Sequence, residues 1–118
     1  MRILDVDQAA PSDAAALTNH LVPDETVHAA FVASTGAILF TDRRIVLAQR
    51  EHLLEARTET SSWPYRSVRH FSIQEGEASD SRTIVRVWLG DDPQPLHLRA
   101  NPGTDLRPLQ RLLADRLV

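Results

Sequence analysis

The sequence predicts a mainly β fold, in which seven short antiparallel strands form a barrel or sandwich and a C-terminal helix caps it. Three observations lead to this prediction. From Thr26 onward, apolar and polar residues alternate with a period of two. Turn-forming residues separate the apolar runs at short, regular spacing. The last segment carries leucines at helical spacing, and an amphipathic helix can cover the open end of such a sheet.

Residues 1–23 predict a helical extension that precedes the strands. Residues 1–10 show no clear pattern, and we expect them to be irregular. Residues 11–22 predict a short helix, because Ser12 and Asp13 can begin one at the positive end of the helix dipole. Its apolar stripe is thin and consists of Ala14, Leu17 and Leu21. A helix this short is marginal alone, so it must dock on the rest of the protein.

Residues 24–100 predict the seven strands. The first three are expected at residues 27–33, 37–40 and 45–49. The third is apolar on both faces, which is typical of a central strand. Turns at Ser34-Thr35-Gly36 and Thr41-Asp42-Arg43-Arg44 separate the three strands. Asp42 can accept backbone N–H bonds in its turn, which explains an acid there without catalysis.

The other four strands follow a polar segment, residues 50–57, that predicts a wide loop. They are expected at residues 57–63, 68–74 and 82–89 and around Leu96 and Leu98, with His97 and Arg99 outward. Pro64 ends the first of these strands because its ring fixes φ. The clearest alternation lies in residues 82–89. There Val85, Val87 and Leu89 share one face, and Ile84, Arg86 and Trp88 share the other.

Residues 101–118 predict the capping helix. Asn101-Pro102-Gly103 breaks the sheet, and Thr104 or Asp105 can cap the helix. If Asp105 is the cap, Pro108 falls in the first turn, where a missing N–H is tolerated. One apolar face contains Leu106, Leu109, Leu112, Leu113 and Leu117. The arginines lie off that face, at Arg107, Arg111 and Arg116.

Two motifs resemble a known family. The hairpin Phe40-Thr41-Asp42-Arg43-Arg44-Ile45 and the corner Trp63-Pro64-Tyr65 occur in the order found in bacterial pleckstrin-homology (PH) families. Those families carry a Phe-Thr-x-x-Arg-Ile/Leu hairpin followed by an Ile-Pro-Tyr-x-x-Ile corner. The resemblance covers residues 22–118 and implies two near-orthogonal sheets, of four and three strands, with a capping helix. It also implies a non-enzymatic bacterial domain, whose relatives form ring-shaped homo-oligomers with five-fold symmetry.

Composition excludes several classes of function. The net charge is −3, and thirteen basic residues are scattered among sixteen acids, which disfavours nucleic acid as a partner. The absence of cysteine excludes disulfides, thiol catalysis and thiolate metal sites. No apolar run approaches the roughly 18 residues of a membrane span, and the N-terminus lacks the apolar region of a signal peptide. We therefore expect a cytoplasmic protein.

No residue pattern predicts catalysis, a cofactor or a metal. The chain has neither a Gly-x-Ser-x-Gly nucleophile elbow nor a glycine-rich phosphate loop. Its five histidines are not at metal-ligand spacing: His20, His28, His52, His70 and His97. We also expect no phosphoinositide binding, because Ser34-Thr35-Gly36 has no cationic side chain. Arg43 and Arg44 alone cannot supply the convergent donors that such a headgroup needs.

The candidate interface residues are aromatic or apolar: Ile84, Trp88, Trp63 and Tyr65. If Val85 faces the core, Trp88 and Ile84 lie on the outer surface of the sheet, where such a pair is typical of a partner-binding patch. Equally, the N-terminal helix can simply cover them. Trp63 and Tyr65 flank Pro64, where packing alone would account for them.

These observations favour a module that self-assembles into a homo-oligomer and mediates protein–protein interaction, with another protein as a further candidate partner. The alternative is a monomeric scaffold that binds a peptide or protein along a strand edge. A third hypothesis, a peripheral binder of anionic lipid, lacks the basic loop that it needs. Solution mass separates the first two hypotheses.

Overall fold

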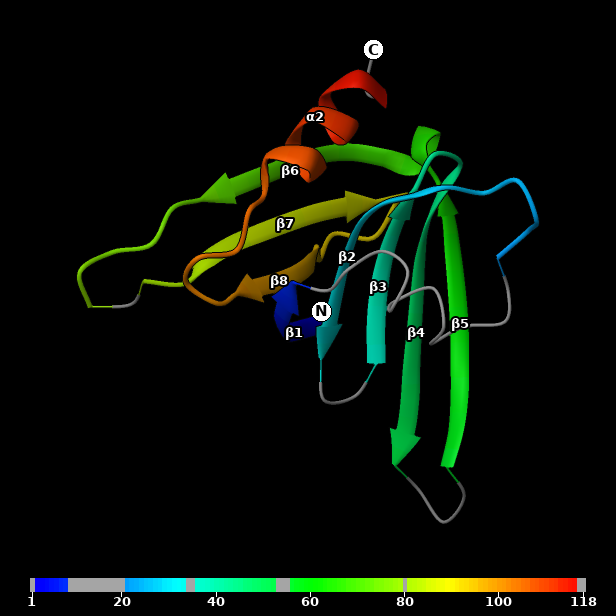
Figure 1. Cartoon of the computed structure of the whole chain (residues 1–118), viewed down its shortest axis with the longest axis horizontal. Helices are drawn as coiled ribbons and strands as arrows, with labels where there is room; N and C mark the ends of the chain where they lie inside the picture. The colour runs from blue at the N-terminus through cyan, green and yellow to red at the C-terminus, as the bar shows by residue number, and fades with distance from the viewer. Residues whose placement is uncertain (1, 9–20, 34–35, 53–55, 80, 117–118) are drawn as a thin grey trace.

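The computed structural model describes residues 2–8, 21–33, 36–52, 56–79 and 81–116 (Figure 1). Its elements in chain order are β1 (Arg2–Gln8), β2 (Val27–Ala33), β3 (Gly36–Thr41), β4 (Arg44–His52), β5 (Ala56–Pro64), the 3-10 helix η1 (Tyr65–Ser67), β6 (Val68–Gln74), β7 (Thr83–Leu89), β8 (Leu96–Ala100) and α2 (Arg107–Arg116). The predicted mainly β fold with a C-terminal helix is confirmed. Within the described part of the chain, no helix has the length and apolarity that a membrane span requires.

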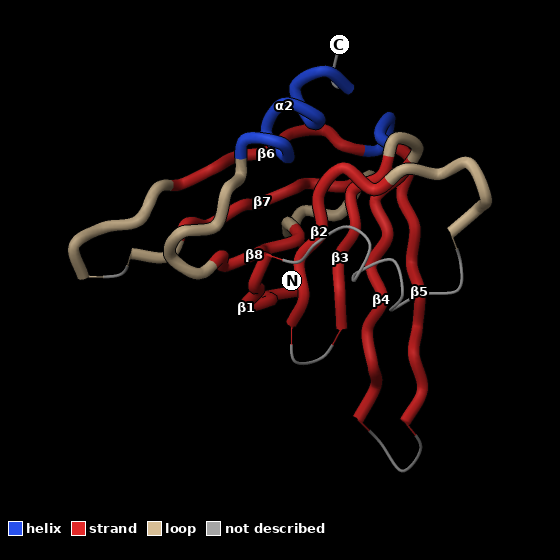
Figure 2. Tube along the Cα trace, in the orientation of Figure 1, coloured by secondary structure: helices blue, strands red, loops and turns tan. Residues whose placement is uncertain are grey.

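The strands form two antiparallel halves that β1 joins. Their order is β5-β4-β3-β2-β1-β8-β7-β6. β1 runs parallel to β8 from Arg2 to Val6, and its last two residues pair antiparallel with β2. A side-chain bond from Asn101 to Asp7 adds to the contact between the two ends of the chain. Figures 1 and 2 show the two halves crossing at a steep angle, with α2 lying over the end of the structure.

The expectation that residues 1–10 are irregular is wrong, because residues 2–8 form β1. The sequence does carry a signal, since Leu4 and Val6 alternate with Asp5 and Asp7. The seven predicted strands are all present, and β1 is an eighth among the described residues. The predicted helix at residues 11–22 falls almost entirely on residues 9–20, outside the described residues. The rest of it, Leu21 and Val22, is not helical.

The wide loop predicted at residues 50–57 is also wrong. β4 continues to His52 and β5 begins at Ala56, and these two residues are register partners. Residues 53–55 lie outside the described residues. The polarity of this segment misled the prediction, because a backbone ladder between two strands does not require apolar side chains.

The main core lies between the two sheet halves and α2. Its fully buried side chains include Phe31, Phe40, Ile38, Ile45, Leu47, Val85, Val87, Leu98, Leu109 and Leu113. Phe31 and Phe40 meet edge to face, with ring centroids 6.1 Å apart. The predicted inward face of β7 and the predicted apolar face of α2 both contribute, so the helix caps the sheet as expected.

The N-terminus of α2 is held by Asp105, whose Oδ1 accepts a 3.1 Å hydrogen bond from the backbone N–H of Arg107. Pro108 is the second residue of the helix, where no intrahelical N–H bond is needed. The Arg107 guanidinium also bonds Asp105 and holds the pKa of that carboxyl down at about 2. Asp105 therefore bonds the first turn of α2, as the prediction expects, but Leu106, whose carbonyl accepts the first intrahelical bond from Gln110, occupies the cap position itself.

A second, smaller cluster lies on the other face of the β2–β4 half. It contains Ala30, Leu39 and Val46, with Leu21 and Val27 packed against it. Residues 45–48 of β4 are all buried, so β4 is covered on both faces. The prediction that this strand is central, made from its continuous apolar run, is confirmed.

Candidate functional site

A turn just before β2 places an acidic side chain against the β3–β4 hairpin. The backbone N–H of Glu25 donates to the carbonyl of Val22 at 3.0 Å, and the Val22 N–H donates back to Glu25 Oε1 at 3.2 Å. Pro23 occupies the second position of this turn, which its fixed φ favours. The turn therefore holds the Glu25 carboxylate in one orientation.

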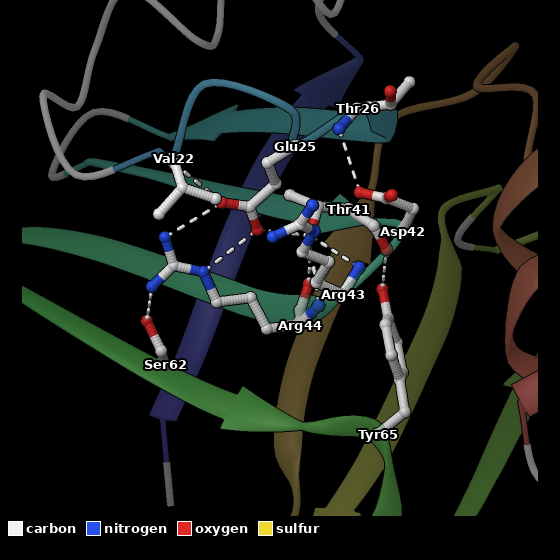
Figure 3. Close-up of polar contacts among 9 residues, drawn as sticks. All are labelled: Val22, Glu25, Thr26, Thr41, Asp42, Arg43, Arg44, Ser62 and Tyr65. Atoms are coloured by element: carbon white, nitrogen blue, oxygen red, sulfur yellow. Dashed lines mark hydrogen bonds and ion pairs between the residues drawn. The ribbon is translucent and has the colours of Figure 1, made fainter.

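Glu25 forms a two-pronged ion pair with Arg44 at the start of β4 (Figure 3). Arg44 Nε lies 2.9 Å from Oε2, and Nη2 lies 2.9 Å from Oε1. The Glu25 side chain has no exposed surface, and that of Arg44 is 25% exposed. The third guanidinium nitrogen, Nη1, donates to Ser62 Oγ on β5 at 2.9 Å. Arg44 thus ties the turn, the hairpin and β5 together.

Thr41, at the end of β3, completes this cluster and is fully buried. Its hydroxyl lies 2.6 Å from Glu25 Oε2, to which it donates. The Thr41 hydroxyl oxygen itself accepts the backbone N–H groups of Arg43 at 3.1 Å and Arg44 at 3.0 Å. The backbone carbonyl of Thr41 accepts a 2.5 Å hydrogen bond from the Tyr65 hydroxyl in η1. We call Glu25, Thr41 and Arg44 the clasp.

Asp42 also accepts a backbone bond, as its place in the turn predicts, but the donor is distant in sequence. Thr26 N–H donates to Asp42 Oδ1 at 2.9 Å, and the Asp42 N–H donates to the Thr26 carbonyl at 2.9 Å. The turn therefore anchors the start of β2 rather than only closing itself. This role needs no chemistry from the carboxylate beyond accepting a hydrogen bond.

The clasp fixes the charge of its members. The hydrogen bonds from Arg44 lower the pKa of Glu25 to about 2, against the opposing effect of burial, and bonds from Thr41 and Val22 lower it further. The bond to Glu25 raises the pKa of Arg44. Burial raises the pKa of Tyr65 well above its usual value. At neutral pH Glu25 is an ionised acceptor whose oxygens are already occupied, so it cannot act as a general base.

Ile84 and Trp88 are half-buried and lie on the face of β7 opposite Val85 and Val87. The Trp88 ring meets the exposed His70 of β6 edge to face, with centroids 4.7 Å apart. The structure thus brings two of the four candidate interface residues to one outer face. We call Ile84, Trp88 and His70 the outer patch.

The other two candidate residues pack inward. Trp63 is partly buried against the main core, and Tyr65 belongs to that core with 7% of its surface exposed. Their positions beside Pro64 are accounted for by packing. Sequence reasoning did not single out Glu25, whose partner Arg44 lies 19 residues away. An isolated acid before a strand gives no indication of that pairing.

A groove runs between α2 and the start of β2. It has a volume of about 470 Å³ and is lined by His28, Pro108, Arg111, Leu112, Asp115 and Arg116. Arg116 stacks over the Tyr65 ring, with its guanidinium carbon 5.7 Å from the ring centroid. We call this hollow the α2 groove. Within the described residues, His, Asp and Glu side chains do not gather in groups of three that could hold a metal ion.

Comparisons with known proteins agree on the fold. The family model for the bacterial PH domain matches residues 3–117. A DUF1696 family protein with a pleckstrin-homology domain from Shewanella loihica PV-4 has a TM-score of 0.78 at 19% identity, covering 97% of this chain and 98% of its own. A pleckstrin-homology domain from Shewanella amazonensis SB2B has a TM-score of 0.67 at 23% identity, covering 89% and 95%.

A relative in sequence is the uncharacterized protein YjqA of Bacillus subtilis (strain 168). It is 30% identical over 79 residues, which are 67% of this chain. The match spans 63% of the length of YjqA, slightly less than two thirds. The family model, which matches residues 3–117, extends over nearly all of the described strands and the capping helix.

Proposed function

The chain belongs to the bacterial PH domain family, and on this premise we propose that it is a non-catalytic module that assembles with copies of itself and mediates protein–protein interaction. The observation that carries the proposal is the outer patch. A half-buried Trp88 and Ile84 on a sheet face form the kind of surface that partners cover. Tryptophan at such a position is among the residues that contribute most to binding.

The state of the buried polar groups supports a non-catalytic role. Glu25 is ionised and accepts hydrogen bonds from Arg44, Thr41 and Val22, so it has no capacity left for a substrate. Tyr65 is buried, and its hydroxyl donates to the Thr41 carbonyl. A catalytic group needs a pKa near the working pH and access to a reacting atom. Neither Glu25 nor Tyr65 meets both conditions.

The position of the outer patch supports self-assembly. Among the described strands, β5 and β6 are the two edges of the sheet, and His70 lies on β6. Edge strands present unpaired backbone groups that readily accept a further strand or surface. The outer patch and the β6 edge are therefore adjacent, and one partner surface can cover both.

Solution mass tests this function. Light scattering coupled to size exclusion at micromolar concentration is expected to give several times the chain mass of 13.2 kDa. The double variant Ile84→Ser/Trp88→Ala is expected to shift the protein to monomer, because it removes the apolar contact area. Val22→Ser is the matched control, since Val22 is an exposed apolar side chain outside the outer patch, with 43% of its surface accessible. A wild-type monomer across a tenfold dilution would overturn the proposal.

The second candidate function is a monomeric scaffold that binds a peptide along a strand edge. The position of β6 at the edge of the sheet formed by the described strands favours it, because an extended segment can add there through backbone hydrogen bonds. This scaffold would remain at the chain mass at every concentration. The same mass measurement therefore separates it from the assembling module.

A further inference from the structure

We propose that the α2 groove receives the acidic loop between β6 and β7 of a neighbouring copy, so that subunits join head to tail. The proposal rests on the self-assembly proposed above and names the surfaces that meet. We call residues 75–79 the acidic loop: its carboxylates are Glu75 and Glu77, and all five residues are exposed. Two surfaces of opposite charge on one chain are the starting observation.

The α2 groove favours an anionic guest. Its two guanidinium groups, Arg111 and Arg116, outnumber its one carboxylate, Asp115. Arg111 is exposed on α2, and Leu112 supplies a buried apolar surface next to it. The volume of about 470 Å³ lies within the range of about 300–1,000 Å³ that ligand pockets occupy. The groove can therefore accept several side chains and holds donors that pair well with carboxylates.

The acidic loop has a shape suited to entering a groove. A Cβ built on Gly76 would lie 2.4 Å from the Ser81 carbonyl oxygen, so the two arms of the loop pass in close backbone contact there. In the described part of the loop, Glu77 is exposed and lies between Gly76 and Ala78, so no bulky side chain flanks it. A loop closed at its base loses less conformational freedom on binding than an open one. Glu77 is thus exposed on a loop whose two arms lie close together at Gly76 and Ser81.

The location of the two surfaces selects a second copy as the guest. Figure 1 shows the acidic loop projecting from the far ends of β6 and β7, on the opposite side of the molecule from the start of β2. A chain therefore cannot place its own loop in its own groove. A contact between two different surfaces is heterologous, and repetition of it closes a ring or extends a filament.

The acidic loop is also continuous with the outer patch. Gln74 pairs with Ile84 at the base of the loop, so Ile84 is the patch residue next to it. A neighbour that takes the loop into its α2 groove lies close to the outer patch as well. Charge would then orient the contact, and the apolar patch would supply buried area.

Charge reversal tests the contact. Glu77→Arg and Arg111→Glu each bring like charges together. Each is expected to raise the protein concentration at which half of the assembly dissociates by about tenfold or more. The variant with both changes restores opposite charges at every interface, and its midpoint is expected to return to the wild-type value. Asp24→Arg, another exposed acid outside both surfaces, is the control. Both target residues are exposed, so urea melts are expected to show unchanged folding.

The outcomes separate this contact from self-assembly itself. Single reversals that assemble like wild type, or a double variant that stays dissociated, would overturn the contact between loop and groove while self-assembly stands. A wild-type monomer would overturn both proposals. Rescue by the double variant is a result that a purely structural role of either residue cannot produce.

Cross-linking supplies an independent measurement, because the chain has no cysteine. The variant Glu77→Cys/Arg111→Cys, treated with a short bismaleimide, is expected to give a ladder of covalent oligomers, since each chain offers one loop and one groove. The two single-cysteine variants are the controls and cannot extend beyond a dimer. An assembled double variant that gives no ladder would overturn the contact.

Discussion

The clasp and the outer patch both combine a polar group with an aromatic neighbour. They differ in the hydrogen bonding and the solvent exposure of these groups. In the clasp, the two Glu25 oxygens accept four hydrogen bonds and have no exposed surface. In the outer patch, His70 is exposed and Trp88 is only half-buried. The most recognisable motif of the sequence therefore serves the fold, whereas the outer patch, the surface for which we propose binding, has no motif of its own.

The interior is where substitution has its largest expected effect. Leu113→Asp removes a fully buried side chain from the cap, a loss of about 2–5 kcal/mol, and buries a carboxylate as well. A domain of this size has about 5–15 kcal/mol in total, so the variant is expected to be largely unfolded in urea melts. Gln110→Asp, on the exposed side of α2, is the matched control and should unfold near wild type. Equal stability of the two would mean that α2 does not cap the sheet.

The clasp is expected to show the next largest effect. Arg44→Ala leaves the buried Glu25 carboxylate without its main partner, and this should cost about 3 kcal/mol of unfolding free energy. Arg43→Ala is the control from the same turn, because Arg43 is exposed, and a change within about 0.5 kcal/mol is expected. Chemical denaturation of both variants measures the difference. A similar cost for both would show that the ion pair does not stabilise the turn.

Acid should weaken the clasp. The pKa of Glu25 is lowered from 4.5 to about 2 by the hydrogen bonds from Arg44, so the folded state binds this proton less readily than the unfolded chain. Its stabilising contribution is complete above about pH 4.5 and is lost as the pH falls towards 2. Glu25→Gln should lack this part of the pH dependence. Unfolding free energies are measured against pH for the wild type and for Glu25→Gln. The difference between the two curves isolates Glu25, because Asp105, whose pKa is also lowered, contributes equally to both.

The smallest expected effect concerns lipid. Liposomes with polyphosphoinositides should not retain the protein at physiological salt, because the Ser34-Thr35-Gly36 segment has no cationic side chain and Arg44 is committed to Glu25. Co-sedimentation with and without the headgroup measures retention. Saturable binding that Arg43→Ala abolishes would contradict this prediction and assign a membrane role to the turn.

Sequence patterns predicted what depends on neighbours along the chain. The alternation in β7 identified its inward face, and leucine spacing identified the buried face of α2. They failed for β1, whose short alternation was overlooked and whose main partner, β8, lies at the other end of the sequence. The sequence likewise could not predict the partner of Glu25 or the walls of the α2 groove, because packing between separate elements creates both.

The central position of β1 has a consequence for the order of folding. Among the described strands, β1 comes first along the chain and lies between β2 and β8, and β8 comes last. The hairpins from β2 to β5 can form while the chain is still growing, since their pairings are local. The joint between the two halves must wait for residues 96–100. Until then one edge of β1 has no strand to pair with. The pairing of β1 with β8 is the step that joins the two halves into one structure.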